Sequence, residues 1–125
     1  MIGESAREGL KKPFNIVHRA YFFAKDVVLF VRSQRVNPVF SPIYSQLVRS
    51  ATSIGANLVE GRVGRSQKDW RNFLWIALKS ANEVKYWLCL LRDGLDAPKE
   101  KIESLISEAV EIANILGSIL VKSKG

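Results

Sequence analysis

Apolar residues between positions 14 and 36 recur at steps of three and four, which predicts an α-helix. One row along this helix consists of Phe14, Val17, Tyr21, Ala24, Val28 and Val31. A second row beside it consists of Ile16, Ala20, Phe23, Val27 and Phe30. A helix that is apolar on two sides needs two surfaces to pack against, so we expect a second subunit to cover part of it. Pro13 is expected in the first turn, and the helix should end near residues 34–36 because Asn37 precedes a proline.

A second helix is predicted after a short turn, and it leads into a second, basic turn. Ser41 is the expected N-cap, with Pro42 in the first helical turn, and the helix should run to about Gly61. Its apolar row consists of Ile43, Leu47, Ala51, Ile54 and Leu58. Residues 61–66 then form the basic turn, in which Gly61 and Gly64 are available for positive φ.

Two more helices complete the pattern. Ser66 and Asp69 form a capping motif for a third helix that runs to about Asp93. Gly94 follows this helix, and Asp96 is expected to cap a fourth one. No stretch alternates as a strand does. The sequence therefore predicts an all-α fold, an antiparallel up-and-down four-helix bundle over residues 13–123, after a flexible basic tail over residues 1–12.

The charge is distributed unevenly along the chain. The net charge is +7 for 125 residues. Residues 1–71 contain 12 Lys and Arg against 5 acidic residues, whereas residues 72–125 contain 7 of each sign. Such an asymmetric field favours a polyanionic partner, with nucleic acid first and a membrane surface second.

Other features of the sequence bear on the location of the protein in the cell and on whether it contains a membrane span or a disulfide. The first 13 residues are polar and lack the apolar region of a secretory signal. The most apolar stretch, residues 20–31, contains Lys25 and Asp26 and is shorter than the roughly 20 residues of a membrane span. We therefore expect a soluble cytoplasmic protein with no membrane partner. The single cysteine, Cys89, excludes an intramolecular disulfide, and its apolar neighbours indicate a core residue.

The sequence carries no recognisable catalytic or cofactor motif. His18 is the one histidine, and there is no Glu-x-x-His pair, zinc motif or phosphate-binding loop. We expect no enzyme activity, no metal and no cofactor. An enzyme that uses His18 or an Arg49–Glu83 pair is the least favoured hypothesis.

Several polar residues occur within the apolar second and third helices. If these helices are antiparallel, residue i faces about residue 128–132 minus i, which places Arg49 near Glu83. The same register places Asn57 near Arg71 or Trp75, and Glu60 near Lys68 and Arg71. We interpret Arg49, Asn57, Glu60 and Glu83 as a structural polar network, since a lone buried charge is costly. A ligand site is the alternative.

The basic turn is the candidate binding site. Its cations are Arg62, Arg65, Lys68 and Arg71, with Trp70 among them. A phosphate-contacting patch with Trp70 as a stacking platform is one interpretation, and a solvated loop is the other. Lys11, Lys12 and Arg19 would extend the patch.

Two segments resemble a known family. The first is residues 46–61, QLVRSATSIGANLVEG, and the second begins with SQKDW at residue 66 and includes KSANE at residues 79–83. They resemble the small bacterial "four helix bundle protein" family, also called 23S rRNA intervening-sequence proteins. The resemblance covers about residues 14–122 and departs from the family pattern at Lys79, where many relatives have Gly.

The resemblance implies a four-helix subunit in a ring-like homopentamer without enzyme activity. The family is also similar to the accessory variability determinant of diversity-generating retroelements, a basic pentamer that associates with a reverse transcriptase and its template RNA. Our leading hypothesis is a homopentameric nucleic-acid-binding protein that prefers structured RNA to DNA. The alternative is a protein-interaction adaptor, for instance for a reverse transcriptase.

Overall fold

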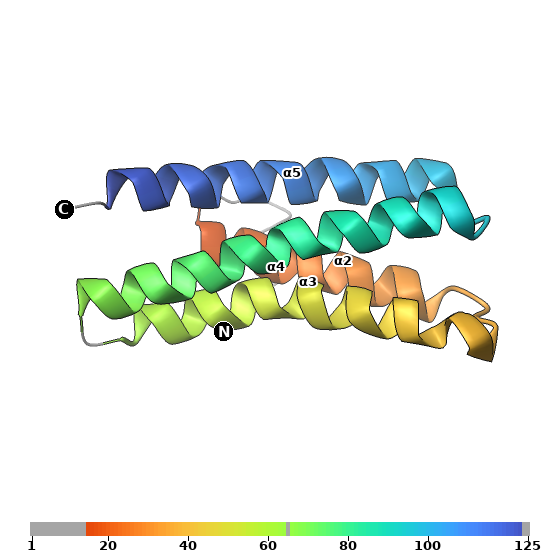
Figure 1. The fold of residues 1–125 in the computed structure, drawn as a ribbon, viewed down its shortest axis with the longest axis horizontal. Helices are drawn as coiled ribbons and strands as arrows, with labels where there is room; N and C mark the ends of the chain where they lie inside the picture. Colours follow the sequence, from red (N-terminus) through yellow and green to blue (C-terminus); the bar gives the residue numbers. More distant parts are fainter. Residues whose placement is uncertain (1–14, 65, 124–125) are drawn as a thin grey trace.

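The computed structural model describes residues 15–64 and 66–123. Within these ranges it contains four α-helices, one short 3-10 helix and no strand (Figure 1). The α-helices are α2 (Ile16–Arg32), α3 (Ser41–Arg62), α4 (Gln67–Gly94) and α5 (Lys99–Lys122), and the 3-10 helix is η1 (Pro38–Phe40). The predicted all-helical fold is confirmed. The predicted tail, with Lys11 and Lys12, lies outside the described residues.

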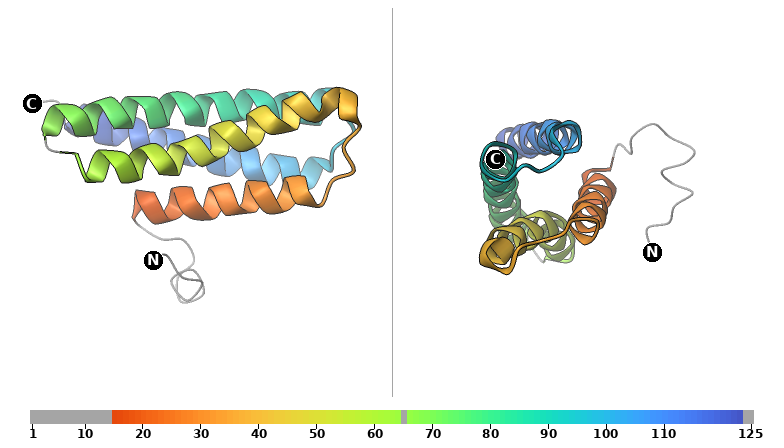
Figure 2. Two further views of the ribbon diagram at one scale, coloured as in Figure 1. Left: turned by 90° about the horizontal axis from the view of Figure 1, so that it is seen from below. Right: turned by 90° about the vertical axis from the view of Figure 1, so that its right-hand side faces the viewer.

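The four α-helices lie side by side along the length of the molecule (Figure 1). The most extensive contacts join α3 to α4 and α4 to α5. Helix α2 packs on α3 and, over a smaller area, on α5. It lies diagonally opposite α4 in the end view (Figure 2). The outer faces of α2 and α4 therefore look in opposite directions.

The core is built from the apolar rows that the sequence predicts. Phe23, Leu47, Ile54, Leu88 and Leu116, one or more from each α-helix, are at most 1% exposed. Burial of apolar side chains of this size supplies most of the stabilisation of such a fold. The other side of α2 remains open, because Tyr21, Val28 and Leu29 are 45%, 43% and 41% exposed.

Two predicted helix starts are wrong, and a competing cap explains the first. The Asn37 side chain accepts a hydrogen bond from the Val39 N–H at 3.0 Å and begins η1, which leads directly into α3. Ser41 is therefore already helical, and its hydroxyl donates to the Pro38 carbonyl at 3.0 Å. Helix α5 begins after Pro98 with no side-chain cap, so Asp96 does not cap it.

The predicted start of α4 is confirmed, whereas α2 begins at Ile16, later than predicted, and ends at Arg32 rather than near residues 34–36. The Ser66 hydroxyl accepts a hydrogen bond from the Asp69 N–H at 3.1 Å and caps α4, as predicted. Helix α2 is capped by Asn15, whose side chain accepts from the Val17 N–H at 2.9 Å. Pro13 lies outside the described residues. Helix α4 extends one residue beyond the predicted end, through Gly94.

Helix α5 combines an apolar composition with an ion pair at its surface. By length and composition it is the one helix among the described residues that qualifies as a membrane span. Core helices share this property, and Ile112 and Leu116 on α5 are fully buried in the bundle. Glu108 and Glu111 on the same helix hold Arg19 of α2.

Candidate nucleic-acid interface

The turn between α3 and α4 is held together by the close approach of the two helices. Gly61 and Gly64 were expected to supply positive φ, but no glycine in the described ranges has it. A Cβ at Gly61 would lie 2.8 Å from both the Phe73 Cβ and the Trp70 Cε3. Gly61 is therefore required because the α4 side chains pack directly on its Cα.

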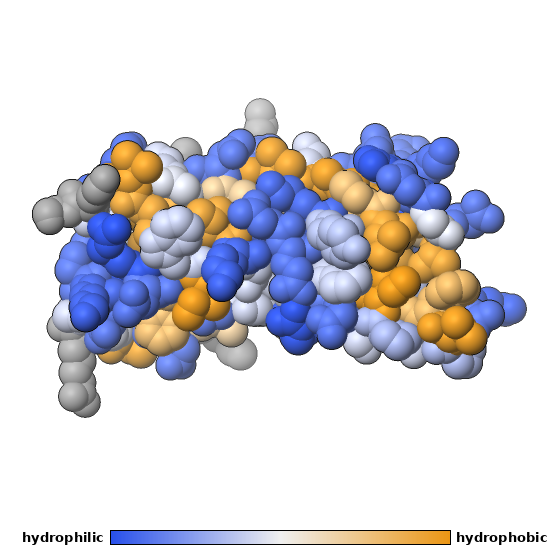
Figure 3. All heavy atoms as spheres, viewed as in Figure 1, coloured by the Kyte–Doolittle hydropathy of each residue, from blue (hydrophilic) through white to orange (hydrophobic). Residues whose placement is uncertain are grey.

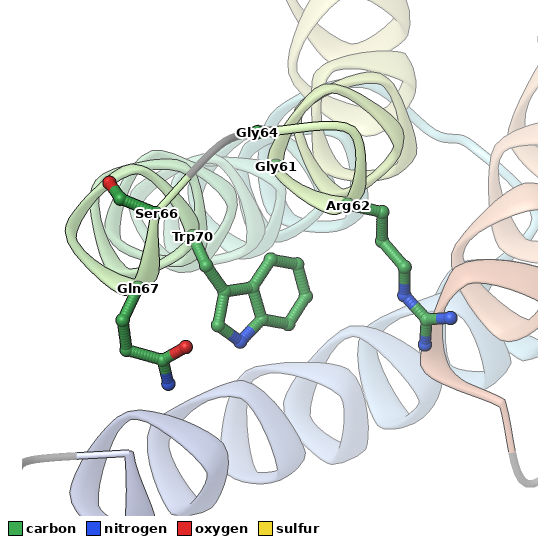
Figure 4. A pocket seen from close by; sticks show the side chains of 6 residues that line it. All are labelled: Gly61, Arg62, Gly64, Ser66, Gln67 and Trp70. Atoms are coloured by element: carbon green, nitrogen blue, oxygen red, sulfur yellow. The ribbon is translucent and has the colours of Figure 1, made fainter.

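A hollow of about 400 Å³ lies beside this turn. It is lined by Gly61, Arg62, Gly64, Ser66, Gln67 and Trp70, and none of these carries a carboxylate. Figure 4 shows the Arg62, Gln67 and Trp70 side chains projecting to one side of the turn, while Ser66 points the other way. A guanidinium, an amide and an indole N–H all donate hydrogen bonds, so the hollow suits an anionic oxygen.

The structure separates the predicted turn cations into different environments. Arg62 and Lys68 are exposed on either side of the turn. Arg71 is half-buried and donates to the Ser123 carbonyl at 3.3 Å, which satisfies an end of α5. Arg65 lies outside the described residues. Trp70 is half-buried against the core, so only part of its ring faces the hollow.

Arg19 does not join this cluster. Its Nε and Nη2 donate to Glu108 at 2.7 and 2.9 Å, and Nη2 also donates to Glu111. The Arg19 side chain is only 12% exposed. Hydrogen bonding to Glu108 in particular raises the pKa of the guanidinium above its usual value. Arg19 therefore joins α2 to α5, and its predicted place in the basic patch at the turn is wrong.

The predicted pair of Arg49 and Glu83 is confirmed. The Arg49 guanidinium donates to Glu83 across α3 and α4, and its Nε donates to Gln46 at 2.8 Å. Glu83 also accepts from the Trp87 indole N–H at 2.9 Å. The bond from Trp87, followed by that from Arg49, lowers the pKa of Glu83. Because its side chain is 34% exposed, this ionised pair lies at the surface.

The other members of the predicted polar network have different partners. Asn57 donates to the Ser53 carbonyl and hydroxyl at 2.8 and 2.9 Å rather than to a group on α4. The Ser53 hydroxyl lies 2.9 Å from that of Ser80 on α4. Glu60 is exposed and forms no ion pair with Lys68 or Arg71, all three of which the structure describes. The predicted register missed the Ser53–Ser80 contact by one residue, since it places residues 75–79 opposite Ser53.

The remaining candidates do not assemble into a catalytic site in the described part of the chain. His18 is half-buried on α2 and forms no hydrogen bond with Arg49 or Glu83 there. No three His, Cys, Asp or Glu side chains gather as metal ligands in residues 15–64 and 66–123. Cys89 is half-buried on α4.

Comparison with known proteins places the chain in a family. Residues 12–118 match the model of the family described as 23S rRNA-intervening sequence protein. A crystal structure of a protein of unknown function from the S23 ribosomal protein family of Bacteroides thetaiotaomicron is similar, with a TM-score of 0.75 and 36% sequence identity. That likeness covers 85% of this chain and 98% of the other. No curated protein matches the chain. The chain belongs to the 23S rRNA-intervening sequence protein family.

Proposed function

We propose that this chain is the subunit of a non-enzymatic homopentamer that binds structured RNA through the basic α3–α4 turn. The hollow beside Arg62 and Trp70 carries the proposal, because its lining offers hydrogen-bond donors and no carboxylate. Arg62 and Lys68 are exposed next to it and extend the positive surface. Several weak phosphate contacts per subunit, repeated around a ring, add up to useful affinity by avidity.

The subunit itself supports assembly. The contacts between Arg49 and Glu83 and between Ser53 and Ser80 support an antiparallel arrangement of α3 and α4. A groove of about 460 Å³ lies between α2 and α3, and among the described residues Lys25 is the only charged one in its lining. The groove is lined by Val17, Ala20, Tyr21, Ala24, Lys25, Val28, Thr52, Gly55, Ala56 and Val59. We call it the α2–α3 groove.

A concave groove receives a convex surface, so we expect two copies that meet there to use different faces. Such a head-to-tail contact generates a closed ring when the rotation between neighbours closes. This geometry supports a cyclic assembly, and the family resemblance supports five subunits. A neighbouring subunit in the groove would also cover the exposed side chains of Tyr21 and Val28, which the packing within one subunit leaves in solvent.

Binding of structured RNA across a range of salt concentrations tests the proposal. The wild-type protein should bind tightly at roughly 50 mM salt and lose affinity steeply towards 200 mM. The double variant Arg62→Ala/Lys68→Ala should lower the salt slope by about two, one for each phosphate contact removed. Arg35→Ala/Lys101→Ala is the matched control, since it removes one exposed arginine and one exposed lysine elsewhere.

Each outcome of this experiment has a definite meaning. An equal effect of the two double variants would show that only net charge matters and would overturn the assignment to the turn. No binding of RNA or duplex DNA at low salt would overturn the nucleic-acid function, and the adaptor hypothesis would then lead. Preference for DNA over RNA would overturn the choice of RNA.

Light scattering tests the assembly. Ala56 is exposed in the α2–α3 groove, so Ala56→Glu places a charge where a neighbour would pack. We expect this variant to lower the measured mass of the wild-type assembly. Ser118→Glu adds the same charge on the exposed face of α5 and should leave the mass unchanged. A wild-type monomer, or an Ala56→Glu variant with the wild-type mass, would overturn the use of this groove.

A further inference from the structure

Six exposed side chains lie in one line along the outer face of α4, and we call this line the α4 stripe. Its members are Lys68, Asn72, Trp75, Lys79, Asn82 and Tyr86. Successive members are alternately four and three residues apart, which keeps them on one side of a helix with 3.6 residues per turn. At 1.5 Å per residue the stripe is about 27 Å long. It begins at the α3–α4 turn, on the helix diagonally opposite α2 (Figure 2).

The stripe combines cations, amides and aromatic rings and contains no carboxylate. The acidic residues beside it on α4 are Asp69 and Glu83. Glu83 already accepts hydrogen bonds from Arg49 and Trp87. Lysines attract phosphates, and asparagine amides both donate and accept hydrogen bonds. The stripe is therefore complementary in charge to a polyanion and can also contact its uncharged groups.

The two aromatic side chains of the stripe face solvent. Trp75 is 53% exposed and Tyr86 is 62% exposed, and neither belongs to the core. The Tyr86 ring meets the Trp87 ring edge-on, with centroids 5.0 Å apart, which orients it on the surface. Figure 3 looks onto α4 and shows hydrophilic residues over the middle of this face, with apolar surface on both sides of them and most extensively towards the right-hand end. Large aromatic rings on a polar helix face indicate a binding surface.

The spacing of these rings fits a strand of nucleotides. Trp75 and Tyr86 are separated by about 16 Å along the helix, with Lys79 and Asn82 between them. A stacked strand advances about 3.4 Å per nucleotide, so the two rings span about five nucleotides. Base faces are accessible in unpaired segments, whereas in a duplex they are stacked on one another.

We propose that the α4 stripe binds an unpaired segment of RNA. Bases stack on Trp75 and Tyr86, Lys68 and Lys79 contact phosphates, and the turn holds the adjoining structured part of the same RNA. This inference rests on the proposed function, since it takes RNA as the ligand. It adds a second surface and a second feature of the ligand, namely unpaired bases next to a folded element.

The test compares a short single-stranded oligouridylate with a matched RNA duplex, using the assembled protein. Trp75→Ala/Tyr86→Ala should weaken binding of the single strand about tenfold for each ring lost and leave the duplex unchanged. Trp75→Phe/Tyr86→Phe keeps both rings and should bind the single strand nearly as the wild type does. Phe40→Ala is the control, because it removes an exposed aromatic ring, 39% accessible, from η1. The mass of every variant is measured in the same samples.

Three results would overturn this inference without affecting the proposed function. They are unchanged binding of the single strand by the alanine double variant, an equal loss for single strand and duplex, and a change in assembly mass. A change in mass would identify the stripe as a contact between subunits. If the wild type binds neither RNA, the proposed function fails as well. If it binds both and only the single strand responds to the loss of the rings, both proposals stand.

Discussion

The close packing at Gly61 can be tested by adding one methyl group. In Gly61→Ala the new Cβ would lie 2.8 Å from the Phe73 Cβ and 2.8 Å from the Trp70 Cε3. The Phe73 Cβ is fixed to the backbone of α4, so it cannot move without shifting that helix. The two helices must therefore move apart beside the α3–α4 turn, and the Trp70 ring must shift as well unless that movement also frees it.

The expected size of the effect follows from two opposed contributions. Overpacking a close contact costs about 1–3 kcal/mol. Alanine is favoured over glycine in a helix by about 0.5–1 kcal/mol, which offsets part of this cost. We therefore expect Gly61→Ala to lower the free energy of unfolding by about 1–2 kcal/mol. At about 4 °C per kcal/mol, the Tm should fall by several degrees.

Gly117→Ala is the matched control. It makes the same substitution within the last third of α5, where a new Cβ would have no atom within 4 Å apart from the backbone of its own helix and its chain neighbours. It should raise the free energy of unfolding by about 0.5–1 kcal/mol, because only the helix preference acts. Thermal and urea unfolding followed by circular dichroism measure both variants at one protein concentration, since assembly shifts the apparent stability. If Gly61→Ala is stabilised as much as Gly117→Ala, the argument from close packing is refuted.

Two further predictions concern the ion pairs. Arg19→Ala removes the charged hydrogen bonds that join α2 to Glu108 and Glu111 on α5 and should lower the free energy of unfolding by about 2 kcal/mol. RNA titrations of this variant should keep the wild-type salt slope, and a reduced slope would return Arg19 to the binding surface. The hydrogen bond from Trp87, followed by that from Arg49, lowers the pKa of Glu83 below 4.5 in the folded protein. The ionised carboxylate therefore stabilises the fold at pH values above 4.5, and this stabilisation is lost as the pH falls below 4.5 through the folded-state pKa. The stability difference between wild type and Glu83→Gln, measured by urea unfolding, should therefore shrink below pH 4.5, and a constant difference would contradict this.

The sequence predicts the helices well because burial follows the apolar periodicity. The expected faces of α3, α4 and α5 supply fully buried residues such as Leu47, Leu88 and Leu116. Helix starts are harder to predict when two residues can both act as caps. Asn37 and Ser41 are both good caps, and only the structure shows that Asn37 begins η1 and so leaves Ser41 inside α3.

The candidate site was predicted less completely, because contacts between residues far apart in the sequence decide which of its basic side chains are available to a ligand. Arg19 looks like a free cation, but it meets Glu108, which is 89 residues away, only after α2 has packed on α5. Arg71 likewise donates a hydrogen bond to the Ser123 carbonyl at the end of α5. Arg49 and Glu83 were found because one short turn sets the register between their two helices. The α4 stripe was not predicted, because the helical period alone does not show which side chains of α4 are exposed to solvent.

The diagonal placement of α2 and α4 has a consequence for the evolution of this chain. The backbones of the two helices do not approach each other closely, because α3 and α5 lie between them around the bundle. An exchange of a solvent-facing residue on α4 therefore leaves the packing around α2 intact. Selection is free to alter the outer face of one helix while the other keeps its neighbours. If the proposed ring forms through the α2–α3 groove and the proposed RNA binds along α4, ligand preference and assembly can change independently of each other.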